Sequence, residues 1–194
     1  MRKGKHALPA ALAVAAVAAL AVATTAPAGS DATGPIKAAW IYVGPHNDGG
    51  WSQAHDRGRL AVEKALGKNV VTTYKEKVPE GPQASQVIDS LVRDGNKIIF
   101  ATSFGYMDQM EAAAKKYPNV YFEHATGYKA GKNFANYFGA GEDAIYLSGI
   151  AAGAATKSGT IGYIVPFPIP EIIRHANAFA LGAQLIRPDV KVKL

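Results

Sequence analysis

Strand-like and helix-like patterns alternate along this chain from residue 38 onward. The predicted strands are short apolar or β-branched runs at 38–43, 70–74, 97–102, 120–125 and 133–138. Amphipathic segments separate the first four: one opens at Trp51, and the others cover 82–94 and 106–117. This repeated βαβ order predicts an α/β fold, a doubly wound parallel sheet with helices on both faces.

The pattern begins again after residue 141. A helix at 144–155, a strand at 160–165, a helix at 171–186 and the start of a strand at 190–194 follow in order. A βαβ unit that ends in mid-strand buries too little apolar surface to form a stable layer alone. We therefore expect a first α/β lobe over 36–140 and the start of a second, incomplete lobe over 141–194.

The N-terminal 28 residues have the pattern of a secretory signal peptide. A basic start is followed by an apolar run over 7–23 and by Ala26-Pro27-Ala28, which suits a signal-peptidase site. An uncleaved membrane anchor is the alternative. Residues 29–35 are expected to form a flexible leader. Cleavage would remove three cations and lower the net charge from +6 to +3, so the basic composition is poor evidence for nucleic-acid binding.

The turn after the first strand is a candidate recognition loop. In an open parallel sheet such turns lie at the carboxyl edge, where ligands bind. Trp51 could stack on a flat heterocycle, or it could pack against the sheet edge. Asn47 and Asp48 could bond a base edge or a ribose hydroxyl, or one of them could cap the following helix.

The turn after the third strand reaches the same edge. It holds Ser103, Phe104, Gly105 and Tyr106, which supply a hydroxyl, apolar surface and room for a close backbone approach. Glu123, His124 and Thr126 end the fourth strand and are further candidates for ligand contact. Glu171 and Arg174 could reach a ligand, but an i,i+3 surface pair is the simpler interpretation.

Several chemistries are not expected. The chain has no cysteine, which excludes disulfides, thiolate metal sites, a cysteine nucleophile and a lipidated cysteine anchor. No phosphate loop or nucleophile motif is present, so we expect no catalytic residues. The pattern G-x-G-x-x-A at 139–144 lacks the later acidic partner of an NAD site, so no cofactor is expected. His46, His55 and Asp48 are too few for a closed metal site.

Long motifs in this chain resemble the basic membrane protein family of ABC-importer substrate-binding proteins, which includes purine-nucleoside receptors. They cover nearly everything after residue 35: IYVGPHNDGGWSQAHDRGR, VPEGP, DGNKIIFATSFGYMD, PNVYFEHATGY and IGYIVPFPIPEIIR. The resemblance implies a periplasmic-binding-protein-like type I fold with two lobes around a cleft. It also implies that Trp51 stacks on the ligand, that Asp48 matches an acidic position of the loop, and that Phe167 faces Trp51 across the cleft.

The resemblance implies that the chain is an extracytoplasmic binding protein rather than an enzyme. Its expected partners are a small-molecule ligand (adenine, another purine or a nucleoside) and the permease subunits of an ABC importer, with no nucleic acid. Two alternatives stay open at this point. One is an enzyme that acts on a nucleoside or a related small molecule, since a fold alone does not decide function. The other is the sensor core of a cytoplasmic repressor, against which the signal segment argues.

Overall fold

A computed structural model describes residues 34–194 of the chain. The predicted signal peptide and most of the predicted leader therefore lie outside the described residues. None of the helices in the described part combines the length and the apolar character that a bilayer span requires.

The first part of the chain forms one parallel sheet, as the sequence predicts. Its strands are β1 (Ile36–Ile41), β2 (Val70–Lys75), β3 (Ile98–Ala101), β4 (Tyr121–Ala125) and β5 (Phe134–Tyr137). They are arranged in the order β2-β1-β3-β4-β5, and each neighbouring pair is parallel. The first strand begins and ends two residues earlier than predicted. Because all strands point the same way, the turns after β1 and β3 meet at one edge.

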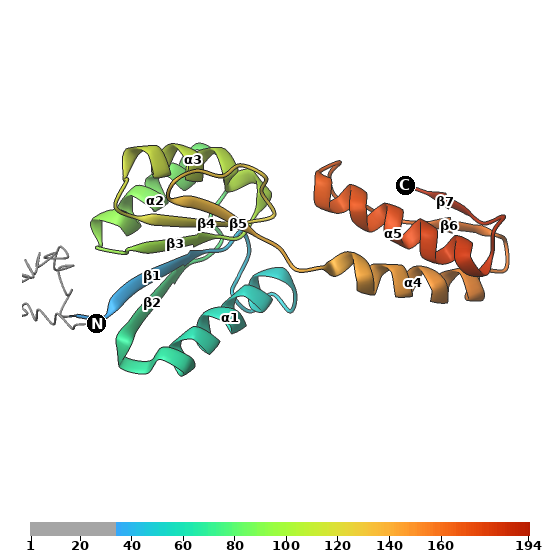
Figure 1. Cartoon of the computed structure of the whole chain (residues 1–194), viewed down its shortest axis with the longest axis horizontal. Helices are drawn as coiled ribbons and strands as arrows, with labels where there is room; N and C mark the ends of the chain where they lie inside the picture. The colour runs from blue at the N-terminus through green and yellow to red at the C-terminus, as the bar shows by residue number, and fades with distance from the viewer. Residues whose placement is uncertain (1–33) are drawn as a thin grey trace, which may run out of the picture. The chain divides into compact units, whose positions relative to one another are not determined.

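Helices cover both faces of this sheet (Figure 1). They are α1 (Trp51–Leu66), α2 (Pro82–Arg93) and α3 (Met107–Lys116), with short 3₁₀ turns at Gly67–Asn69 and Phe104–Tyr106. The picture shows α2 and α3 on one face and α1 on the other. The doubly wound arrangement predicted from the alternation is therefore confirmed.

The larger core lies between the sheet and the helices α2 and α3. Fully buried side chains from both layers meet there: Ile41, Ile99, Phe122, Ile88, Leu91 and Met110. Each of them is at most 1% exposed. Burial of such side chains contributes on the order of 1.5–3 kcal/mol each, and this layer holds the strand ends in place.

The face of α1 that points inward is polar, which the sequence pattern did not predict. The spacing predicts an apolar face of Ala54, Gly58, Ala61, Val62, Ala65 and Leu66, and this face is largely exposed. The buried residues are instead Ser52, Asp56 and Arg59. The guanidinium of Arg59 donates to Asp56 at 2.7 Å, and the hydroxyl of Tyr42 in turn donates to Asp56 at 3.1 Å. Because these groups satisfy one another, the helix can bury them against the sheet.

A second, smaller unit follows β5. It consists of α4 (Gly141–Ala155), β6 (Thr160–Gly162), α5 (Pro170–Ile186) and β7 (Lys191–Lys193), and the two strands pair in parallel. The strand predicted over 160–165 ends at Gly162, ahead of a proline-rich loop. The helices α4 and α5 cross closely: a Cβ built on Gly182 would lie 2.1 Å from the carbonyl oxygen of Tyr146.

Candidate functional site

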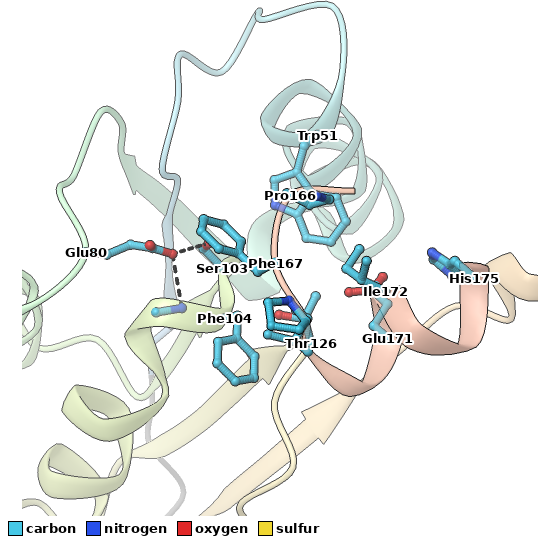
Figure 2. A pocket seen from close by; sticks show the side chains of 13 residues that line it. Trp51, Glu80, Ser103, Phe104, Thr126, Pro166, Phe167, Glu171, Ile172 and His175 are labelled. Atoms are coloured by element: carbon cyan, nitrogen blue, oxygen red, sulfur yellow. Dashed lines mark hydrogen bonds between the residues drawn. The ribbon is translucent and has the colours of Figure 1, made fainter. Parts of the chain in front are cut away.

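A cavity of about 650 Å³ lies at the carboxyl edge of the larger sheet. Its volume falls within the range of small-molecule sites, about 300–1,000 Å³. Figure 2 shows the side chains around it, which come from the loops after β1, β2, β3 and β4 and from residues 166–175. The lining comprises Trp51, Glu80, Ser103, Phe104, Gly105, Thr126, Pro166, Phe167, Pro168, Ile169, Glu171, Ile172 and His175.

Trp51 opens α1 and presents part of its ring to solvent. Its side chain is 43% exposed, which is unusual for so large an apolar group. The indole Nε1 donates to the backbone carbonyl oxygen of Thr102 at 2.5 Å, and the ring of His55 packs against the indole in an edge-on arrangement at 4.7 Å. The ring is thus anchored at the sheet edge and also lines the cavity, and its stacking on a ligand stays a prediction.

Phe167 lines the same cavity from the second unit. It is 63% exposed and lies between Pro166 and Pro168, which restrict the backbone on either side. Phe104, from the 3₁₀ turn after β3, adds further apolar surface to the lining. Three aromatic rings from three separate segments therefore line one concave surface.

The polar part of the lining centres on Glu80, which the sequence interpretation did not select. Its Oε1 accepts hydrogen bonds from the hydroxyl of Ser103 at 2.5 Å and from the backbone N–H of Gly105 at 3.0 Å (Figure 2). Glu80 lies in the VPEGP motif between β2 and α2. The sequence did contain a signal that could have identified Glu80: its loop also follows a strand of the parallel sheet. Such a loop reaches the edge where ligands bind.

Asn47, Asp48 and Tyr106 do not line the cavity. The carboxylate of Asp48 accepts the backbone N–H groups of Gly50 at 2.8 Å, of Gln53 at 3.0 Å and of Ser52 at 3.0 Å. These hydrogen bonds, that from Gln53 above all, lower the pKa of Asp48 to about 2. Asp48 thus satisfies the free N–H groups at the start of α1, which is the capping role weighed above.

Tyr106 is a core residue. Its ring is fully buried, and its hydroxyl donates to the carbonyl oxygen of Val78 at 2.5 Å. Burial raises the pKa of this phenol above its ordinary value. The residue type allowed a role in ligand recognition, but the 3₁₀ turn at 104–106 directs the side chain toward the helix layer instead.

Two residues at the end of β4 contribute to the cavity, one by positioning a loop and one by lining it. His124 is fully buried, and its Nε2 lies 2.7 Å from the carbonyl oxygen of Ser103, which positions the loop that carries Ser103. Thr126 lines the cavity and has a φ of 72°, a conformation that β-branched residues rarely adopt. Its buried Oγ1 has no partner among the residues that the structure describes. Backbone outliers of this kind cluster at ligand sites.

Glu171 and Arg174 do not form the surface pair that their spacing suggested. Arg174 instead contacts Glu142 at 3.6 Å and lies over the ring of Phe138, with 5.2 Å between the guanidinium carbon and the ring centroid. Glu171 is at the first turn of α5 and lines the cavity. The i,i+3 rule fails here because Glu142, from a neighbouring helix, competes for the same guanidinium.

The two histidines weighed as metal ligands make other contacts. The ring Nδ1 of His46 lies 2.7 Å from a carboxylate oxygen of Glu76, and His55 packs against Trp51. Within residues 34–194, no group of three histidine and acidic side chains is arranged to hold a metal ion.

The chain is similar to known proteins over nearly all of the described residues. The sequence model of one protein family, the PnrA-like ABC transporter substrate-binding proteins, matches residues 36–194. A purine-binding protein of Brucella abortus is 45% identical over 159 residues, which are 82% of this chain and 45% of that protein. A protein of Haloferax volcanii is 40% identical over 173 residues, which are 89% of this chain and 44% of that protein. Its name provisionally assigns it to glucose binding by an ABC transporter.

A solved structure shows the same fold. An ABC transporter solute-binding protein from Aeropyrum pernix K1 superposes with a TM-score of 0.63 at 22% identity, over 81% of this chain and 46% of that one. The chain thus spans less than half the length of these relatives. The matched region includes every residue that lines the cavity, and we conclude that the chain belongs to the family of PnrA-like ABC transporter substrate-binding proteins.

Proposed function

We propose that this chain carries the ligand-recognition surface of an exported protein that binds a purine base or nucleoside and delivers it to an ABC permease. One observation carries the proposal. Trp51 and Phe167, two solvent-exposed aromatic side chains from segments distant in sequence, line a single cavity of ligand size. Exposed aromatic rings beside a concave surface offer flat faces for stacking, and any purine ring can use them.

The largely apolar lining favours a purine over a sugar. Much of the lining is aromatic, proline or isoleucine, and its polar side chains are Glu80, Ser103, Thr126, Glu171 and His175. A sugar carries hydroxyl groups around its whole ring and needs hydrogen-bonding partners on several sides. A purine has two apolar faces and a polar edge, which fits this lining better. The relative named for purine binding supports the same ligand class.

The ligand class can be tested on the chain itself with ligand-observed NMR, which detects weak binding. Adenine, hypoxanthine, guanine and adenosine form the test panel, and glucose is included because of the Haloferax relative. We expect saturable binding of at least one purine and none of glucose. Binding of glucose without any purine would overturn the purine proposal, and conversion of a bound nucleoside to product would favour the enzyme alternative.

A pair of variants connects binding to the cavity. Phe167→Ala removes an aromatic ring that lines the site, and we expect it to weaken purine binding. Tyr121→Ala is the matched control, because Tyr121 is also well exposed, at 59%, and does not line the cavity. Equal effects of the two substitutions would contradict a site at this cavity.

Export and delivery are the parts of the proposal that rest on the N-terminal pattern and on the family. A signal peptide that ends at Ala28 would leave a mature chain beginning near Gly29. N-terminal sequencing of material secreted from an expressing cell tests this directly. An intact Met1 on protein in the cytoplasm would rule out export by cleavage, and with it the proposed delivery to a permease.

A further inference from the structure

The carboxylate of Glu80 is fixed in the cavity lining by two hydrogen bonds. Its Oε1 accepts from both the Ser103 hydroxyl and the Gly105 N–H, so the loop after β2 is tied to the loop after β3. Gly105 is required for this contact, since a Cβ built there would lie 2.4 Å from the carboxylate carbon of Glu80. A side chain at position 105 would displace the carboxylate. Glycine at position 105 thus leaves room for a carboxylate at this point of the lining.

The second oxygen of Glu80 is free to accept a hydrogen bond. A carboxylate offers about four acceptor positions, and the two recorded bonds both use Oε1. Among residues 34–194, no hydrogen bond or ion pair involves Oε2 of Glu80. This residue lines the cavity, which places its carboxylate beside a bound ligand.

Two other polar side chains of the lining, Ser103 and Glu171, also offer acceptors to a ligand. The hydroxyl of Ser103 donates its proton to Oε1 of Glu80. The Ser103 oxygen therefore offers only its lone pairs. Glu171 adds a second carboxylate to the lining, and in the described part of the chain it forms no ion pair. A ligand that satisfies Glu80 must bring an N–H donor, and a negative charge beside the two carboxylates would be repelled. The hydroxyl of Thr126 and the ring of His175 are the other polar groups of the lining.

We propose that Glu80 selects the ligand by its hydrogen-bond donors: Oε2 accepts an N–H of the bound heterocycle, so the cavity prefers neutral, N–H-bearing rings to fully N-alkylated or anionic ones. The inference rests on the proposed function, since it needs a flat heterocycle in this cavity. It assigns the ring faces to the aromatic residues and the polar edge to Glu80.

The test compares adenine with two analogues on the wild-type chain. N6,N6-dimethyladenine lacks the exocyclic donors, and 9-methyladenine lacks the donor on the five-membered ring. A hydrogen bond to a charged acceptor corresponds to about a tenfold to hundredfold change in affinity. We expect one analogue to bind at least about tenfold more weakly than adenine. Equal affinities for all three ligands would overturn the proposal without any variant protein.

Glu80→Gln separates a lost hydrogen bond from steric exclusion by the added methyl groups. Glutamine keeps an oxygen that can accept from Ser103 and Gly105, but it places an amide donor where Oε2 lies. We expect adenine to bind at least about tenfold more weakly to this variant, and the variant to lose the discrimination between adenine and the weaker analogue. Discrimination that persists unchanged in Glu80→Gln would show that sterics cause it, and would overturn the assignment.

Asp108→Asn controls for the change in charge. Asp108 lies in the first turn of α3, next to the loop that Glu80 holds, but it is 76% exposed and does not line the cavity. An equal loss of adenine binding in this variant would indicate a general electrostatic effect and not a direct contact. If no purine binds the wild-type chain at millimolar concentration, the proposed function itself fails. If purines bind without donor discrimination, only the role of Glu80 fails.

Discussion

The indole nitrogen of Trp51 donates a hydrogen bond to the backbone carbonyl oxygen of Thr102, 2.5 Å away. Trp51 follows β1 and Thr102 follows β3, and these two strands are neighbours in the sheet. The bond joins the two loops that form this edge and fixes the orientation of the ring. The indole therefore needs little reorganisation to present a face to a ligand.

Trp51→Ala should weaken purine binding by about 1–3 kcal/mol, the scale of stacking between a base and an aromatic ring. The free energy of unfolding should change much less, because the ring is 43% exposed. The purine affinity of Trp51→Phe should lie between those of the wild type and Trp51→Ala, since phenylalanine keeps an aromatic face and loses the hydrogen bond to Thr102. Titration calorimetry measures the affinities, and urea denaturation measures the stabilities.

A large loss of stability with unchanged affinity would instead make Trp51 a structural residue. The chain has one other tryptophan, Trp40, which is 5% exposed and stacks on Phe100 at 4.4 Å. Trp40→Phe should show that reverse pattern, a loss of stability with little change in affinity, and it is the matched control for an indole in this fold.

The sequence predicts the order of elements well because each strand and helix is short, apolar on a regular period and bounded by glycine or proline. Gly95 ends α2 and Pro118 follows α3, as the pattern indicates. The cavity could be predicted in part: the turns that hold Trp51 and Ser103 must share an edge once the sheet is parallel. Which residues of a turn face the cavity could not be predicted, because one 3₁₀ turn sends Phe104 to the cavity and Tyr106 to the core.

The inward face of α1 could not be predicted for a different reason. A period of 3.6 residues identifies an apolar stripe, but Asp56 and Arg59 are buried because they pair with each other and with side chains on β2 and after β1. Such partners are distant in sequence. Only the three-dimensional arrangement shows that Tyr42 and Thr72 complete the network.

Asp56→Asn should destabilise the fold by about 3 kcal/mol, because removing one partner of a buried pair leaves the other charge uncompensated. The side chains of Asp56 and Arg59 are only 8% and 10% exposed. Glu63 still contacts Arg59 at 3.0 Å, which limits the loss. Urea denaturation followed by circular dichroism gives the free energy of unfolding.

Asp189→Asn is the matched control for this substitution. Asp189 pairs with Arg187 at 3.7 Å but is 83% exposed, so its loss should cost less than about 1 kcal/mol. Tyr42→Phe should cost about 1 kcal/mol, since Asp56 keeps its bond to Arg59. Similar values for Asp56→Asn and Asp189→Asn would show that the inner pair contributes little.

Gly182→Ala should destabilise the smaller unit. The added Cβ would lie 2.1 Å from the carbonyl oxygen of Tyr146, so α4 and α5 would have to separate. Overpacking of this kind costs about 1–3 kcal/mol. Hydrogen exchange measured by mass spectrometry, which follows α4 and α5 separately from the larger sheet, should show faster exchange in both helices.

Gly58→Ala applies the same substitution to a helix without such a neighbour. A Cβ there meets nothing within 4 Å, so the change should stabilise α1 by about 0.5–1 kcal/mol. The two alanine variants should therefore have effects of opposite sign. Stabilisation by both would contradict the close crossing of α4 and α5.

Stability should fall as the pH decreases below the ordinary histidine pKa of 6.5. Burial lowers the pKa of His124, although hydrogen bonds to Ser103 and Asn136 partly oppose this, and burial also lowers the pKa of His55. Above pH 6.5 both rings are mostly neutral in the folded and the unfolded chain, so they add no pH dependence. Below it, the unfolded chain binds protons that the folded chain resists, and the free energy of unfolding decreases.

The slope should be at most about 1.4 kcal/mol per pH unit for each ring, and it should extend from pH 6.5 down to the lower pKa of the folded rings. His124→Gln can still donate to the carbonyl oxygen of Ser103 but does not titrate, so it should remove one contribution and reduce the slope. The double variant with His55→Gln should lose most of it. Urea denaturation at a series of pH values between about 5 and 7.5 measures the slope. A slope that the double variant leaves unchanged would mean that neither histidine resists protonation in the folded chain.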